Sequence, residues 1–262
     1  MKSIIKKYGQ GQPALVIVAC LHGDEIVGRR VIDELYKLKI IKGQLKTIIA
    51  NQAALEKGVR FIDQDLNRSF PGNKNSNLAE EKIAHYILQE IKYADYIVDI
   101  HSTSTDTKDV MIIKKRDAQI DQMIRFINPR RVLLMSENYG QQALVNFCSG
   151  VSIEYGRHKA EDTFIKSLQD IKTLMHHLGM IKMKDVAEER SATENYQVFD
   201  VASKPAHFRI NKNIHNFVKV LSGDVLGYIN NRPVLAKEDF YPVLFGEQAY
   251  KDIIGFKASK IK

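Results

Sequence analysis

The sequence predicts an α/β fold for residues 1–188 and a small β-rich domain for residues 189–262. Three observations support this prediction. Residues 14–20 are apolar without a break, as in a strand that is buried on both faces of a largely parallel sheet. Residues 26–39 repeat apolar side chains at helical spacing, so a helix follows the strand. Beyond about residue 183 the helical spacing ends, and short β-branched runs replace it.

The elements between these two ends continue the alternation of strand and helix. Short apolar runs predict strands at 45–51, 93–100, 110–113, 131–135 and 151–154. Apolar residues three and four positions apart predict helices at 78–91, 120–126 and 162–178. The stretch 60–72, R-F-I-D-Q-D-L-N-R-S-F-P-G, has neither period and ends on Pro-Gly. We therefore expect a loop rich in functional groups there.

The C-terminal part has the pattern of a small β domain. Its predicted strands lie at 196–201, 217–220, 225–229, 234–235 and 243–245. Breaks such as S-G-D and N-N-R-P separate them, as expected of turns. The boundary with the first part is expected within D-V-A-E-E-R-S-A, residues 185–192.

Composition narrows the classes of partner and compartment. Lys and Arg number 39 against 31 Asp and Glu, a formal charge of +8 that suits an anionic partner. Much of the excess is scattered lysine, which is typical of a solvated surface, so we expect a small acidic substrate and no nucleic acid. The two cysteines lie far apart in the sequence, which argues against a disulfide framework. No signal-peptide region and no apolar run of about 20 residues is visible, so we expect a cytoplasmic protein without a membrane partner. A homo-oligomer is left open.

The chemistry begins with His22 and Glu25, in the sequence H-G-D-E just past the first strand. Ligands of open α/β sheets bind outside the carboxyl ends of the strands. An imidazole and a carboxylate three residues apart on a tight turn suit one metal ion, and Gly23 would help the turn to close. A lone pair of this kind also arises by chance, as His158 and Glu161 show in a polar helix start.

Two further strand ends carry His101 and Glu154. Two His and one Glu with an open fourth position form a catalytic zinc set, whereas structural zinc usually has four ligands rich in Cys. Taken alone, His101 is better explained as a structural histidine, and the loop at 60–72 reverses that preference. Asp99 shares its face of the strand. Glu154 could act as a general base that later protonates a leaving amine.

The loop at 60–72 adds Arg60, Asn67 and Arg68. A guanidinium can hold a carboxylate through two hydrogen bonds or stabilise an oxyanion at an attacked carbonyl, and an amide adds a donor. The alternative is a solvated loop in which the arginines pair with Asp63 and Asp65.

Four motifs in order and spacing resemble the succinylglutamate desuccinylase/aspartoacylase family, a branch of the zinc carboxypeptidase-like enzymes. They are H-G-D-E at 22–25, R-F-I-D-Q-D-L-N-R-S-F at 60–70, D-I-H-S-T at 99–103 and I-E-Y-G at 153–156. A weaker match is Y-P-V-L-F-G-E-Q-A-Y at 241–250. The resemblance implies a mixed central sheet flanked by helices, with a β-rich C-terminal cap.

The same resemblance implies one Zn²⁺ per chain, held by His22, Glu25 and His101. It implies Glu154 as the general base and Arg60 as the group that polarises the scissile carbonyl.

For the substrate, the resemblance implies that Asn67 and Arg68 hold a carboxylate and that Tyr250 contributes a contact from the second domain. Aspartoacylases have a further arginine about ten residues before the catalytic glutamate, for a second acid group. Here that stretch is Q-Q-A-L-V-N-F-C-S-G, without a cation. Arg157, His158 or Lys159 are the candidates to replace it.

We therefore expect a zinc-dependent amidohydrolase that cleaves a small anionic N-acyl amino acid. One alternative is a carboxypeptidase-like metallopeptidase, which the small capping domain disfavours because it would crowd out longer chains. Another is a metal-bound binding protein without catalysis, which the complete set of catalytic positions disfavours.

Overall fold

A computed structural model describes residues 3–104, 107, 109–136, 138–184, 192–246 and 252–261. Its strands are β1 (Ile4–Gln10), β2 (Ala14–Ala19), β3 (Gly43–Ile49), β4 (Tyr96–Thr103), β5 (Val110–Ile113), β6 (Arg131–Leu134), β7 (Val151–Arg157), β8 (Glu194–Ser203), β9 (Phe208–Ile210), β10 (Val225–Ile229), β11 (Arg232–Leu235), β12 (Tyr241–Val243) and β13 (Ile253–Ile261). Its helices are α1 (Ile26–Leu35), α2 (Gln52–Lys57), α3 (Ala79–Ile91), α4 (Ala118–Ile127) and α5 (Glu161–His177), with 3₁₀ turns η1 (Leu66–Arg68) and η2 (Leu144–Asn146).

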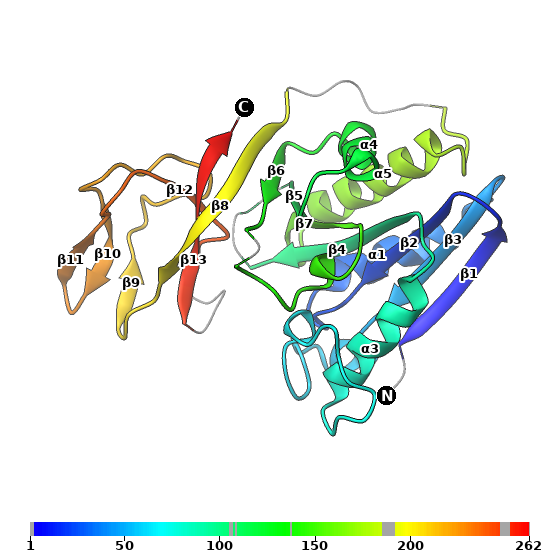
Figure 1. The fold of residues 1–262 in the computed structure, drawn as a ribbon, viewed down its shortest axis with the longest axis horizontal. Coiled ribbons are helices and arrows are strands. Elements are labelled where there is room, and N and C mark those ends of the chain that lie inside the picture. Colours follow the sequence, from blue (N-terminus) through cyan, green and yellow to red (C-terminus); the bar gives the residue numbers. More distant parts are fainter. Residues whose placement is uncertain are drawn as a thin grey trace.

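Within these described residues, one ten-stranded mixed sheet runs through the molecule in the order β1-β3-β2-β4-β7-β5-β6-β8-β13-β12 (Figure 1). The strands β3, β2, β4 and β7 are parallel, and β1 and β5 pair antiparallel with their neighbours β3 and β7. A separate three-stranded sheet, β11-β10-β9, lies on the side of the molecule where the large sheet ends in β13 and β12 (Figure 1). The predicted α/β fold with a mixed sheet and a β-rich C-terminal part is confirmed.

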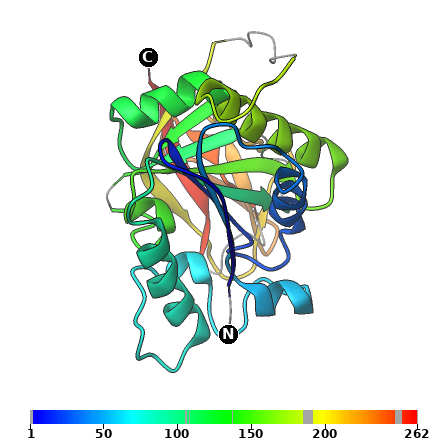
Figure 2. The same cartoon turned by 90° about the vertical axis from the view of Figure 1, so that its right-hand side faces the viewer.

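The sheet is buried on both faces where the predicted site residues lie. Leu15 and Ile17 of β2 point into a core with α1, α4 and α5, whereas Val16 and Val18 point into a core with α3. Figure 2 shows helices on the two sides of the central strands. Each apolar side chain removed from water in this way contributes roughly 1.5–3 kcal/mol. The central strands are therefore a rigid base for the loops at their carboxyl ends.

The C-terminal part continues the main sheet. Strand β8 pairs parallel with β6 and antiparallel with β13, so the chain re-enters the sheet after the first part ends. Most of the predicted boundary, residues 185–191, lies outside the described residues, and the division at 188/189 stays a prediction. Among the described residues, no helix has the length and apolarity needed to span a membrane.

Several elements differ from the sequence-based expectation. The predicted strand at 217–220 is wrong, because only Val220 forms an isolated bridge, to Phe240. Among the elements of the described residues, strands β1, β9 and β13, helix α2 and the 3₁₀ turns η1 and η2 were not predicted. Strand β1 is an edge strand whose adjacent Lys6 and Lys7 are exposed, so it lacks the apolar run of a central strand.

Candidate active site

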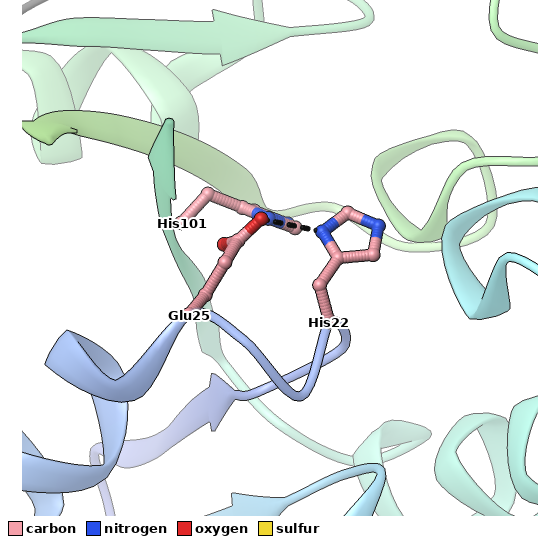
Figure 3. Close-up of side chains that lie close together, drawn as sticks. All are labelled: His22, Glu25 and His101. Atoms are coloured by element: carbon pink, nitrogen blue, oxygen red, sulfur yellow. Dashed lines mark hydrogen bonds and ion pairs between the residues drawn. The ribbon is translucent and has the colours of Figure 1, made fainter. Parts of the chain in front are cut away.

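Three side chains from different elements converge at the carboxyl end of the sheet. His22 lies in the turn after β2, Glu25 directly precedes α1, and His101 lies on β4. Figure 3 shows the Glu25 carboxylate pointing toward His101 and His22. Glu25 Oε1 lies 2.6 Å from His22 Nδ1, and Oε2 lies 3.1 Å from His101 Nδ1. All three side chains are buried, so the carboxylate has exchanged water for these nitrogens.

The turn that carries His22 depends on a glycine for a reason of packing. A Cβ on Gly23 would lie 2.2 Å from the backbone carbon of Ala54 in α2, far inside van der Waals contact. The Gly23 amide also donates to the carbonyl of Arg60 over 3.0 Å. Gly23 therefore lets three segments pack together behind the cluster, which is a stronger requirement than the turn closure that the sequence suggested.

Each imidazole has a second carboxylate on its far nitrogen. Asp99 Oδ2 lies 2.7 Å from His101 Nε2, and Asp65 Oδ1 lies 3.1 Å from His22 Nε2. A carboxylate that accepts the N–H of one ring nitrogen leaves the other nitrogen with its lone pair. For His101 this leaves Nδ1, which lies against Glu25, as the nitrogen open to a metal ion. His22 Nδ1 lies against the same carboxylate, while Arg60 Nη2 approaches His22 Nε2 at 2.9 Å alongside Asp65. The sequence showed that Asp99 shares a strand face with His101, but it suggested for Asp65 only a pairing with arginine.

Charge inside this buried cluster is balanced by contact. Burial disfavours ionisation of Glu25, but the two facing imidazoles hold the pKa of its carboxyl well below the usual range. Burial likewise disfavours the imidazolium, yet Asp99 and Glu25 raise the pKa of His101, and Glu25 raises that of His22. The cost of burying these three groups is thus offset by their contacts with groups of opposite charge.

The donor set fits a divalent metal ion. One ligand atom from each of His22, Glu25 and His101 can be chosen so that all lie within 4.8 Å of one another. Imidazole nitrogen and carboxylate oxygen are ligands of Zn²⁺, and three protein ligands leave a fourth position for substrate or water. The carboxylates of buried Asp99 and half-buried Asp65, on the far nitrogens, match the outer shell that metal-binding histidines usually have.

Glu154 lies beside the cluster without belonging to it. On β7 it is the register partner of His101 on β4, so the two side chains come from adjacent strands. Its Oε2 is buried and, among the described residues, has no hydrogen-bond partner. The pKa of Glu154 is raised to about 7, because burial and the nearby Glu25 outweigh the lowering effect of His101. A carboxylate of this kind can gain and lose a proton near neutral pH.

The loop at 60–72 contributes its three predicted residues to the same place. Arg60 Nη2 donates to Asp65 Oδ2 over 3.0 Å, and its Nη1 lies 3.7 Å from Glu25 Oε1. Asn67 Oδ1 accepts from the backbone of Leu144 over 2.9 Å, which leaves the side-chain NH₂ to donate. Arg68 Nη1 donates to the backbone carbonyl of Asn67 over 2.7 Å. The ion pair expected between arginine and Asp65 is present, and it fixes Arg60 beside the cluster.

A buried acid that sequence reasoning did not assign to the site holds this loop in shape. Glu80, in the first turn of α3, is fully buried and accepts from the amides of Ile62, Asp63 and Gln64 at 2.8–3.4 Å. Its Oε1 also accepts from Asn51 Nδ2 over 2.9 Å. The sequence signal was only an acidic helix start, since the partners lie 16 or more residues away.

A cavity of about 340 Å³ opens onto the His22, Glu25 and His101 cluster, Glu154 and the loop at 60–72, a volume within the range of small-molecule sites. Its lining includes every predicted site residue that the structure describes: His22, Glu25, Arg60, Asn67, Arg68, His101 and Glu154. Tyr250 lies outside the described residues, so its predicted contact is not addressed. Of the candidates for a second cation, His158 lines the cavity, with its Nδ1 2.9 Å from Ser102 Oγ.

The sequence and the fold of this chain are similar to those of known proteins. The chain is 21% identical over 280 residues to a succinylglutamate desuccinylase of Vibrio campbellii, an alignment that covers 94% of this chain and 79% of the relative. It is 31% identical over 100 residues to a probable aspartoacylase of Prochlorococcus marinus, which covers 35% of this chain and only 34% of that relative. The crystal structure of murine aminoacylase 3 shares the fold, with a TM-score of 0.80, 18% identity and 97% of each chain covered.

Residues 11–146 match the family model of the succinylglutamate desuccinylase/aspartoacylase catalytic domain. This segment includes three of the four motifs quoted above. The fourth motif, around Glu154, follows the matched segment directly on the next strand of the sheet. On this match, the chain belongs to the succinylglutamate desuccinylase/aspartoacylase family.

Proposed function

We propose that this protein is a zinc-dependent amidohydrolase that cleaves an N-acyl amino acid into a carboxylate and a free amino acid. One observation carries the proposal. The same cavity is lined by the buried cluster of His22, Glu25 and His101, by Glu154 and by Arg60 and its neighbours in the loop. Glu154 Oε2 has no hydrogen-bond partner in the part of the chain that the structure describes. Membership of the family supports the reaction class.

In this proposal, His22, Glu25 and His101 hold one Zn²⁺. When bound, the ion supplies Lewis acidity to the substrate carbonyl and makes a water molecule more acidic. Asp99 and Asp65 keep the two imidazoles oriented through their far nitrogens, at 2.7 and 3.1 Å. These contacts therefore orient the ligand side chains in advance of metal binding.

Glu154 carries the proton. Its carboxylate takes a proton from the attacking water as oxygen adds to the scissile carbonyl carbon. The same group then delivers that proton to the departing nitrogen as the C–N bond breaks, so the amino acid leaves as a neutral amine. A pKa near 7 suits both transfers, because neither protonation state is strongly favoured at neutral pH.

The loop residues bind and polarise the substrate. Arg60, oriented by Asp65, donates to the carbonyl oxygen as negative charge develops there. Arg68 and the NH₂ of Asn67 hold the substrate carboxylate. Tyr250 and the C-terminal domain are proposed to narrow the entrance, which would restrict the site to small substrates.

The test is a hydrolysis screen of acetyl-, succinyl- and formyl-amino acids with the zinc-loaded full chain. We expect release of a free amino acid, and a Glu154→Gln protein that keeps its zinc but loses about 10²–10⁴-fold in turnover. Glu161→Gln, an exposed Glu on α5, is the matched control and should behave as the unaltered chain. Cleavage of peptides in preference to acyl-amino acids would favour a peptidase, and no turnover of any substrate would refute the proposal.

A further inference from the structure

We infer that the cavity is built for a substrate with a single acid group, whose variable part is apolar and uncharged. This inference rests on the proposed function and specifies its substrate class. The apolar group can belong to the acyl half or to the amino-acid side chain, since either can extend beyond the scissile amide. The alternative is a substrate with a second carboxylate.

One wall of the cavity is apolar. Its residues come from β5, the segments after β6 and β12, the turn η2 and strand β13: Ile112, Met135, Leu244, Val145 and Phe256. Met135 and Phe256 are only 8% and 5% exposed. A carboxylate placed against such a wall would lose its hydration without gaining a hydrogen bond, which is costly, whereas an alkyl or aryl group would gain from leaving water.

The cavity offers one arginine for a substrate carboxylate. Among the described residues that line it, the arginines are Arg60 and Arg68, and both belong to the loop at 60–72. Arg60 is bound to Asp65, which leaves Arg68 as the guanidinium for one substrate carboxylate. Asp24 also lines the cavity and adds negative charge. His158 also lines the cavity, but its Nδ1 lies against Ser102 Oγ at 2.9 Å. The two arginines and Asp24 thus provide one guanidinium for a substrate carboxylate and favour a single substrate charge over two.

The segment between β6 and β7 also favours an apolar group beside the substrate carboxylate. It lies directly beside the proposed carboxylate site, because the Leu144 amide donates to Asn67. Its contributions to the cavity include Ala143, Val145 and Asn146, none of which is charged. A substrate held at Asn67 therefore has apolar surface next to its bound carboxylate.

The test measures kcat/KM of the zinc-loaded full chain for four substrates: N-acetyl-L-leucine, N-hexanoylglycine, N-acetylglycine and N-acetyl-L-aspartate. We expect at least one apolar substrate to exceed N-acetylaspartate by about 10²-fold, the scale on which apolar pockets discriminate. Preference for N-acetylleucine places the apolar group in the amino-acid half, and preference for N-hexanoylglycine places it in the acyl half. Preference for N-acetylaspartate would overturn this inference and leave the proposed function standing. Turnover of none of the four by a protein that cleaves another acyl-amino acid in the hydrolysis screen would do the same, whereas no turnover in either experiment would overturn both.

A variant that adds a positive charge tests the apolar wall itself. Met135→Lys keeps the length of the side chain but brings an ammonium group to the cavity wall, so the ratio of aspartate to leucine substrate should rise by about tenfold or more. Ile165→Lys adds the same charge on α5, where Ile165 is 58% exposed, and should leave the ratio unchanged. An unchanged ratio in a folded, active Met135→Lys protein would contradict the inference. If that protein does not fold, the four-substrate series on the unaltered chain decides.

Discussion

Asp99 offers a direct test of how the cluster is oriented. Its carboxylate is 1% exposed, and its Oδ2 lies 2.7 Å from His101 Nε2, on the side away from Glu25. Asp99→Asn keeps the size and nearly the shape of the side chain but removes its charge. The amide can also present its NH₂ to the imidazole, which would place the proton of His101 on the nitrogen that should bind zinc.

The expected loss follows from this geometry. Removing the carboxylate behind a metal-binding histidine typically lowers metal affinity by about 10–100-fold, or roughly 1.4–2.7 kcal/mol. We expect the upper half of that range, because Asp99 is buried and water cannot replace it at Nε2. The hydroxyl of Ser152 also lies near Asp99 Oδ2, but at 3.5 Å from it.

The assay is competition for Zn²⁺ between the protein and a chromogenic chelator of known affinity. Asp170→Asn is the matched control, since Asp170 is also 1% exposed but pairs with Lys166 on α5. The control should bind zinc as the unaltered chain does, even if its melting temperature falls. Equal zinc affinity of the folded Asp99→Asn protein and the unaltered chain would refute the proposed orientation of His101.

Three further perturbations test other parts of the structure. Glu80→Gln leaves amides of residues 62–64 without a full acceptor, so the free energy of unfolding should fall by about 1–3 kcal/mol and KM should rise; denaturant titration and kinetics measure both. Gly23→Ala forces a Cβ against the backbone of Ala54 and should reduce bound zinc, as measured by elemental analysis; full zinc occupancy would contradict the packing argument. Cys20 has a pKa raised to about 12 by burial, so a thiol reagent at pH 8 should modify it only after unfolding.

The sequence predicted best what a local pattern encodes. The apolar run at 14–20 corresponds to β2, and the polar residues directly after it mark the carboxyl end where the cluster forms. Because parallel strands end at one edge of a sheet, His101 and Glu154 could be placed near His22 without knowing the strand order. The order itself, with β7 beside β4, could not be predicted from periodicity.

Features that depend on distant partners were not predictable in this way. Glu80 looks like an ordinary acidic residue at a helix start, and only the folded loop shows that its carboxylate is an acceptor for three backbone amides. Asp65 looks like a solvated loop residue, yet it joins His22 to Arg60. Strand β1 escapes prediction because an edge strand can keep its lysines in water.

The central claim is that His22, Glu25 and His101 bind one zinc ion. Anomalous diffraction at the zinc edge, on crystals of the zinc-loaded full chain, tests it most directly. We predict one strong peak about 2.0–2.2 Å from His22 Nδ1, His101 Nδ1 and a Glu25 carboxylate oxygen, and no such peak in crystals of His101→Ala grown in the same way. A peak elsewhere, or a peak at this position that survives in His101→Ala, would contradict the account.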